Sequence, residues 1–186
     1  MRRAQPKLAS YAVGGEGVRV GILSDTHGVV DERVLAALSG CDVAVHAGDV
    51  VGAAVLAALR ERVAEVFAVA GNNDVAAKWP RSELAELDAL AERLWLELPG
   101  GALAVEHGHR AGSGRERHPR LRRRYAGARA VVYGHSHRLL IDDDEEPWVL
   151  NPGAAGRERT FGGPSLLLLH ATTKRWQVEA TRFETR

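Results

Sequence analysis

The sequence predicts an α/β protein, and two patterns along the chain support this class. Between residues 18 and 70, three apolar runs each end on a polar turn, and helix-like segments rich in Ala and Leu separate them. Such alternation is typical of βαβ units with a parallel sheet. After residue 93, short Gly-rich or acidic turns join the apolar runs, which indicates β-hairpins. The pattern thus predicts a parallel first half and a hairpin-rich second half.

The strands of the first half are expected over residues 18–23, 42–46 and 63–70. Asp31 is a predicted N-cap for the first helix, and Gly40 is expected to end that helix. Two more helices are expected over residues 52–62 and 82–93. Each of the three strands runs into a polar turn, which in a parallel sheet is the end where ligands bind.

Hairpins are expected in the second half, over residues 93–98 with 102–106 and over residues 138–141 with 147–150. A helix is expected over residues 118–125, a buried strand over residues 130–133, and a closing pair of strands over residues 165–170 and 176–182. The run Asn151-Pro152-Gly153 predicts a turn with a structural role.

The composition is that of one ordinary globular domain. Of 186 residues, 45% are apolar and 26% are charged, and the formal net charge is +1. No global field therefore favours nucleic acid or a membrane surface. The single Cys41 excludes an intrachain disulfide and suits a reducing compartment, and no apolar run approaches the roughly 18–20 residues of a membrane span. We expect a cytoplasmic protein.

The first residues of the chain carry two arginines but no apolar stretch of the length that a signal peptide needs. Gly14, Gly15 and Gly17 also break any local pattern. We therefore expect a flexible N-terminal tail over residues 1–17 and a single domain over residues 18–186.

Seven potential metal ligands follow predicted strands at the points where the strands end. They are Asp25, His27, Asp49, Asn72, His107, His135 and His137. Taken singly, these segments have ordinary explanations, such as a capping Asp or a Gly-Asp turn. Taken together, carboxylates, an amide oxygen and imidazoles suit Mn, Fe, Ni or Zn. Two ions roughly 3.5–4 Å apart need a bridging carboxylate and several ligands each, which this set supplies.

These segments, in this order, resemble the motifs of the calcineurin-like metallophosphoesterase superfamily, in particular its small phosphodiesterase branch of the YfcE type. The resemblance covers roughly residues 18–170. It implies a four-layer αββα sandwich, in which two mixed β-sheets are flanked by helices. It also implies that one metal ion is held by Asp25, His27, Asp49 and His137. The other ion would be held by Asp49, Asn72, His107 and His135, so that Asp49 is the bridge.

The resemblance implies a dinuclear metal-dependent phosphodiesterase that hydrolyses small phosphate esters through a metal-bound hydroxide. Two divalent ions are the expected cofactors, with Mn as the first choice and Ni, Fe or Zn as alternatives. The candidate catalytic residues are Asp49, Asn72, His107 and Asp74, the last by orienting its own loop or a ligand. The expected partner is a small phosphate ester, without nucleic acid or membrane, in a homodimer or homotetramer.

One position departs from the pattern of many superfamily members, which have His after the motif Asn. Here that residue is Asn73, which has no useful acidity, so the general acid is unassigned and esters with good leaving groups are favoured. The small branch commonly lacks this His as well.

Three further features of the sequence are candidates for a role near the site. His46 is expected to be structural or to support a ligand, and His109 is placed near the rim of the site but outside the metal set. The arginines between Arg115 and Arg129 are expected to form a solvated basic helix balanced by residues 142–146, and guidance of phosphate or nucleic acid is the alternative.

Two alternative functions remain open. One is a phosphomonoesterase. The other is a catalytically silent scaffold of the same fold, a route that the Vps29-type relatives of the superfamily illustrate with an altered metal site. Loss of catalysis should erode the ligand set, and no ligand is missing from this sequence.

Overall fold

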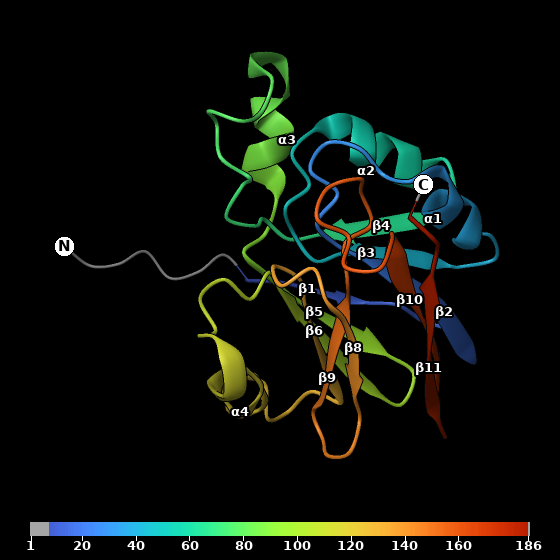
Figure 1. Ribbon diagram of the computed structural model, residues 1–186. Helices are drawn as coiled ribbons and strands as arrows, with labels where there is room; N and C mark the ends of the chain where they lie inside the picture. The colour runs from blue at the N-terminus through green and yellow to red at the C-terminus, as the bar shows by residue number, and fades with distance from the viewer. Residues whose placement is uncertain (1–7, 186) are drawn as a thin grey trace.

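Two mixed β-sheets lie face to face at the centre of the protein, and helices cover both outer faces (Figure 1). The structure is a computed structural model, and it describes residues 8–185. Three apolar clusters separate the layers: one between the sheets and one under the helices of each outer face. This arrangement confirms the predicted four-layer sandwich.

The five-stranded sheet has the order β11-β10-β2-β3-β4. Its strands are β2 (Gly17–Leu23), β3 (Val43–His46), β4 (Glu65–Ala68), β10 (Ser165–Thr172) and β11 (Trp176–Arg182). Strands β2, β3 and β4 are parallel, as the alternating pattern of the first half predicts, whereas β10 pairs antiparallel with both β2 and β11.

The six-stranded sheet has the order β1-β5-β6-β7-β9-β8. Its strands are β1 (Leu8–Ala12), β5 (Arg93–Leu98), β6 (Gly101–Glu106), β7 (Ala130–Tyr133), β8 (Leu139–Asp142) and β9 (Trp148–Pro152). The pairs β5/β6 and β8/β9 are the two predicted hairpins, and β7 lies parallel to both β6 and β9.

The core between the sheets is made by alternate residues of the facing strands, such as Ile22 and Leu167 on one sheet and Leu103 and Val105 on the other, all fully buried. Each such side chain contributes roughly 1.5–3 kcal/mol through burial. Strands β3 and β7 are buried on both faces, which explains the apolar sequences Val43-Ala44-Val45 and Ala130-Val131-Val132.

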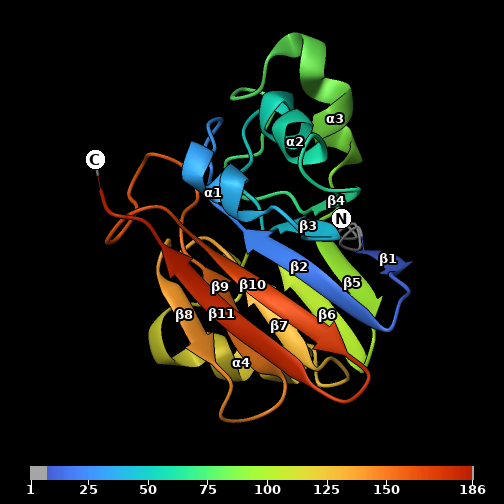
Figure 2. The same ribbon diagram turned by 90° about the vertical axis from the view of Figure 1, so that its right-hand side faces the viewer.

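Helices α1 (Glu32–Ala37), α2 (Ala53–Arg60) and α3 (Leu84–Ala89) gather near the outer face of the five-stranded sheet (Figure 2). The Asp31 carboxylate caps α1 as predicted, because it accepts a hydrogen bond from the Arg33 amide. Helix α4 (Arg117–Arg124) follows a short 3₁₀ turn (Gly114–Glu116) and packs Leu121 on the outer face of the six-stranded sheet. No helix in residues 8–185 has the length and apolarity needed to cross a membrane.

The prediction of a flexible tail over residues 1–17 is wrong for Leu8–Ala12. Leu8–Ala12 forms β1, the edge strand of the six-stranded sheet, and it pairs parallel with β5. The Tyr11 ring also contacts Phe67 at 4.7 Å between centroids. The paired residues are 85 positions apart along the chain (Leu8 pairs with Arg93), so no local sequence pattern predicts this pairing. Residues 1–7 of the predicted tail lie outside the described residues.

Two other predicted boundaries are wrong. The helix expected over residues 82–93 is a 3₁₀ turn (Arg81–Glu83) followed by α3, and it ends at Ala89 because Leu90 turns to extended geometry and Ala91 bridges to Val69. The turn expected at Asn151-Pro152-Gly153 begins only at Gly153, since the first two residues complete β9. In both cases pairing with a distant strand overrides the local preference.

Candidate metal centre

The seven candidate ligands lie on loops at the carboxyl ends of five parallel-paired strands, and both sheets contribute. Asp25 and His27 follow β2, Asp49 follows β3, Asn72 follows β4, His107 follows β6, and His135 and His137 follow β7. The loops are tied to one another by backbone hydrogen bonds, including the Asp25 amide to the Gly48 carbonyl (2.9 Å) and the His27 amide to the Asp49 carbonyl (3.0 Å).

Five of these ligands have left-handed backbone geometry. The φ angles are 54° at Asp25, 48° at His27, 57° at Asp49, 64° at His135 and 56° at His137. Asp and His adopt this region more easily than most residues, but it still costs on the order of 1–3 kcal/mol per position. Backbone strain concentrated on one set of polar residues indicates a functional site.

The first group of ligand atoms comes from Asp25, His27 and His137. The Nε2 atoms of the two histidines are 3.4 Å apart, and His137 Nε2 is 3.2 Å from Asp25 Oδ1. Two imidazole nitrogens that bind one ion at about 2.0–2.1 Å with a tetrahedral angle are roughly 3.4 Å apart. The donors of this group therefore fit a single divalent ion.

The second group comes from Asp25, Asp49 and His107, so Asp25 belongs to both groups, and Asn72 lies beside the second one. His107 Nε2 is 3.1 Å from Asn72 Oδ1 and 3.4 Å from Asp49 Oδ2. The opposite ring nitrogen, His107 Nδ1, lies 2.8 Å from the Ala47 carbonyl, which fixes the ring so that Nε2 faces the group. Asp49 Oδ2 is also 3.8 Å from His27 Nε2, so this carboxylate stands between the two groups.

The His135 side chain lies farther from the two groups of ligand atoms than the other candidate ligands do. Its ring centroid lies 5.3 Å from that of His107, and it belongs to neither compact group of ligand atoms among the described residues. Its backbone amide nevertheless donates to both carboxylate oxygens of Asp25, at 3.2 and 3.0 Å. The β7 loop is therefore attached to the first group through its main chain.

The charge states of Asp49 and His107 follow from the contacts that these two residues make. Burial disfavours the charged form of Asp49, but the hydrogen bond and charge of His107 and the donors of Asn73 outweigh it and lower the pKa of Asp49. Burial likewise opposes protonation of His107, but Asp49 and Asp25 raise the pKa of His107 above its usual value. A bound cation would take the place of the His107 proton.

Asn73 orients the Asp49 carboxylate. Its amide donates to Asp49 Oδ1 at 2.7 Å, and its side-chain Nδ2 donates to Asp49 Oδ2 at 2.6 Å. Lys78 in turn donates to Asn73 Oδ1, which fixes the orientation of the side-chain amide. The sequence offered only the position of Asn73 next to Asn72 as a sign of this role.

Asp74 orients loops, as expected. Its carboxylate accepts hydrogen bonds from the amides of Val50 (3.1 Å), Val51 (2.8 Å) and Gly71 (2.7 Å) and from the Trp79 indole nitrogen (3.1 Å). It therefore connects the loop after β3 to the loop after β4, and so holds Asp49 near Asn72.

His46 is fully buried and has a structural environment, as expected. Its Nε2 lies 3.0 Å from the Thr26 hydroxyl, and burial lowers the pKa of His46 to about 4. Asn151 is also structural, because its side-chain amide donates to the Gly134 carbonyl (2.9 Å) and to the Ser136 hydroxyl (3.0 Å). Asn151 thus holds the loop that carries His135 and His137.

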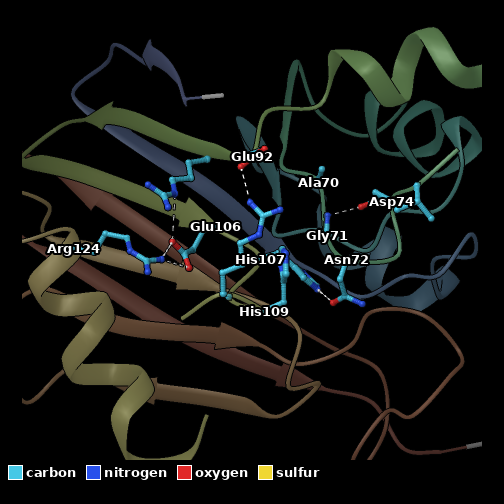
Figure 3. A pocket seen from close by; sticks show the side chains of 13 residues that line it. Ala70, Gly71, Asn72, Asp74, Glu92, Glu106, His107, His109 and Arg124 are labelled. Carbon is cyan, nitrogen blue, oxygen red and sulfur yellow. Dashed lines mark hydrogen bonds and ion pairs between the residues drawn. The ribbon is translucent and has the colours of Figure 1, made fainter. Parts of the chain in front are cut away.

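A cavity of about 450 Å³ opens beside the second group, and we call it the Glu106 pocket (Figure 3). Asn72, His107 and His109 face it, which places His109 at the rim as predicted. Glu106 lies on its far side, where Arg124 donates to both carboxylate oxygens at 2.8 and 2.6 Å. Three carboxylates and three guanidinium groups line the pocket, so its charges are balanced.

Several arginines of the predicted basic stretch are paired with acidic groups. The pairs are Arg120 with Glu116, Arg122 with Asp142 and Glu145, Arg124 with Glu106, and Arg129 with Glu146. The predicted balance with residues 142–146 is confirmed for Arg122 and Arg129.

Comparison with known proteins agrees with these features. The model of the calcineurin-like phosphoesterase superfamily domain matches residues 18–174. A probable metallophosphoesterase of Methanocaldococcus jannaschii is 29% identical over 159 residues, covering 81% of this chain and 77% of that protein. Another from Methanothermobacter thermautotrophicus is 28% identical over 170 residues, covering 88% of this chain and 91% of that protein.

Solved structures share the fold. Vps29 of Entamoeba histolytica, complexed with zinc, has a TM-score of 0.70 at 19% identity, covering 90% of this chain and 99% of that one. A structure described as a novel archaeal phosphodiesterase has a TM-score of 0.65 at 21% identity, covering 88% of this chain and 99% of that one. Since the family model spans most of the chain and the architecture agrees with it, the protein belongs to the calcineurin-like phosphoesterase superfamily.

Proposed function

We propose that the protein is a phosphodiesterase that hydrolyses small phosphate esters at a dinuclear metal centre. The observation that carries this proposal is the convergence of carboxylate, amide and imidazole groups on two adjacent points, with Asp49 between them. The donor set of oxygen and nitrogen atoms suits Mn²⁺, with Ni, Fe or Zn as alternatives. The likeness in fold to an archaeal phosphodiesterase favours diesters over monoesters.

Divalent ions held by these residues would lower the pKa of a water and neutralise phosphate oxygens. Hydrolysis forms one P–O bond from water and breaks the P–O bond to an alcohol, which leaves with a proton. Asp49 is kept ionised and oriented by Asn73 and His107, and its carboxylate would serve as a ligand shared by the two ions. Burial is the main cause that lowers the pKa of His27 and of His135, which keeps both rings in the neutral form that a ligand needs.

Arg159 is a further candidate for contact with the reacting phosphate, because it lies beside the first group of ligands. Its guanidinium Nη2 lies 3.4 Å from His27 Nε2, and its backbone has a φ of 51°. No ion pair joins this guanidinium to a carboxylate within residues 8–185, so its donors are available to an anion. With Asn73 in place of an acid, the leaving alcohol receives no proton from that position, which favours esters with acidic alcohols.

The test is hydrolysis of bis(para-nitrophenyl) phosphate and of para-nitrophenyl phosphate by metal-stripped protein, with Mn²⁺, Ni²⁺, Zn²⁺ or Mg²⁺ added back in turn. We expect turnover that depends on the added metal and a rate that is higher for the diester. Asp49→Asn should reduce the rate at least about 100-fold, because the loss of a direct ligand exceeds the 10–100-fold effect typical of outer-shell changes. The control is Asp144→Asn, at an exposed position in the acidic tip.

Different results would support the alternatives. Faster turnover of the monoester would make the protein a phosphomonoesterase. Metal analysis and calorimetry that find no bound divalent ion would instead support the catalytically silent scaffold. Equal activity of Asp49→Asn and Asp144→Asn would overturn the assignment of the centre.

A further inference from the structure

A second cavity, of about 630 Å³, begins at the β7 loop and takes no part in the function proposed above. Ser136, which lies between the candidate ligands His135 and His137, is one of the residues that line it. Its other defining residues are Arg117, Arg138, Arg182, His118 and Phe161, and we call it the arginine groove. These residues come from α4, the β7 loop, the loop before β10, and β11, elements that are far apart in the sequence.

The charge of the arginine groove is not balanced. Three guanidinium groups line it, and no carboxylate does so among residues 8–185. Neither Arg138 nor Arg182 has a side-chain hydrogen bond or ion pair to another described residue. Asp142, which contacts the groove residue His118 at 2.8 Å, is already paired with Arg122 at 2.6 Å. The Glu106 pocket, by contrast, has as many carboxylates as guanidinium groups.

The guanidinium groups are held in place without being neutralised. Arg138 lies over the ring of Phe161 at 4.3 Å, and Arg117 lies over the ring of Tyr133 at 5.4 Å. The Nε atom of Arg117 also donates to the Gly112 carbonyl at 2.9 Å, which leaves its terminal nitrogens for another acceptor. Stacking fixes a guanidinium at a low entropic cost while its N–H donors stay available, which suits the recognition of phosphate.

The groove is adjacent to the candidate metal centre. Ser136 is the residue between two of the ligands, and Asn151 donates to its hydroxyl at 3.0 Å. An ester whose phosphorus lies at the metal centre could therefore extend one of its alcohol groups past Ser136.

We propose that the arginine groove binds a second phosphate group of the substrate, so that the preferred substrate is a small ester with a further phosphate on one of its alcohols. This inference rests on the proposed phosphodiesterase function and names its substrate class. Three guanidinium groups that have no carboxylate partner among the described residues, in a cavity of ligand size, match an oxyanion of high charge. The exposed ring of Phe161 offers an apolar surface to the linking part of the alcohol.

The test compares two chromogenic substrates: a nitrophenyl ester of thymidine monophosphate, and the same compound with a second phosphate on the sugar. Products are separated by chromatography so that release of either alcohol is counted. We expect kcat/KM of the wild-type protein to be about tenfold higher for the doubly phosphorylated substrate, as one charge-assisted contact would give. This preference should shrink as salt rises.

Two variants, Arg117→Met and Arg182→Met, should each lower this preference severalfold, because each removes one guanidinium from the groove. The matched control is Arg123→Met, at an exposed position on the same helix as Arg117 and outside the groove. Equal loss of preference in the control, or no preference in the wild-type protein, would overturn the proposal.

A binding experiment separates failure of the groove from failure of the proposed function. Metal-free protein is titrated by calorimetry with thymidine bisphosphate and with thymidine monophosphate. Tighter binding of the bisphosphate, lost in Arg182→Met, supports the groove even if no ester is hydrolysed. Equal affinities would overturn the proposal even if the diesterase assay succeeds.

Discussion

The candidate ligands must supply donor atoms and must also adopt left-handed backbone geometry, and their residue types suit both requirements. Asp25, His27 and Asp49 supply donor atoms, and Asp and His are also among the few side chains that accept left-handed backbone geometry at moderate cost. Val51, close to them in the sequence, has the same left-handed backbone geometry, which is unfavourable for a β-branched residue. Its amide donates to Asp74 at 2.8 Å, so the position is held by the loop rather than by its own preference.

At the same scale, His46 makes folding stability depend on pH. Its pKa is about 4 in the folded protein because of burial, and near 6.5 when unfolded. The unfolded chain therefore takes up the proton first as the pH falls. The contribution of His46 to the free energy of unfolding is fully present above about pH 6.5. It decreases by up to about 3 kcal/mol as the pH falls toward 4.

Urea unfolding at several pH values between 7.5 and 4.5, in the presence of chelator, measures this dependence. His46→Asn keeps a polar partner for Thr26 but cannot titrate, so its stability curve should be flatter over this window. His170→Asn, at an exposed position, is the matched control and should keep the wild-type slope. A curve for His46→Asn as steep as that of the control would show that other groups cause the pH dependence.

At the scale of elements, the short loops after the strands depend on close backbone contact. Gly71 lies in the loop after β4, and a Cβ at this position would lie 2.2 Å from Asp49 Oδ1 and 2.3 Å from the Asp49 backbone nitrogen. No side chain can be accommodated there unless the β3 loop moves. The approach of these two loops brings Asn72 and Asp49 together.

We predict that Gly71→Ala destabilises the protein by about 1–3 kcal/mol, as overpacking does, and weakens manganese binding at the same time. Urea unfolding and calorimetry with Mn²⁺ measure the two effects. The matched control is Gly127→Ala, where the nearest atom to the new Cβ would be 3.7 Å away on Trp95. Unchanged metal affinity in Gly71→Ala would contradict the role assigned to this contact.

At the scale of the whole molecule, the candidate centre joins the two sheets. Asp25, Asp49 and Asn72 follow strands of the five-stranded sheet, whereas His107 and His137 follow strands of the six-stranded sheet. An ion bound by both sets would connect the sheets at one edge of their shared core. Because the unfolded chain does not present these ligands together, binding adds to the free energy of unfolding.

We therefore predict that Mn²⁺ at 100 times its dissociation constant stabilises the protein by about 2.7 kcal/mol and raises Tm by roughly 5–10 °C. Differential scanning calorimetry with Mn²⁺, and again after chelation, measures the shift. Asp144→Asn should show the same shift as the wild-type protein, while Asp49→Asn should show a much smaller one. An equal shift in both variants would place the bound ions elsewhere.

The sequence by itself determined the parallel first half, both hairpins, the basic helix and the seven candidate ligands. Each of these follows from local periodicity, from short turns, or from polar residues placed where apolar runs end. The same local evidence predicted a flexible tail where β1 forms, and a helix to residue 93 where α3 ends at Ala89.

Only the tertiary structure decided the pairing of β1 with β5, the contacts of Asn73 and Asp74, and the arginine groove. All of these join residues whose neighbours in space come from other loops or from the opposite sheet. Arg117 and Arg122 are similar in sequence context, yet one lines the groove and the other pairs with Asp142. The difference depends on which carboxylates the fold brings close to each guanidinium. These distances in space cannot be read from the order of residues along the chain.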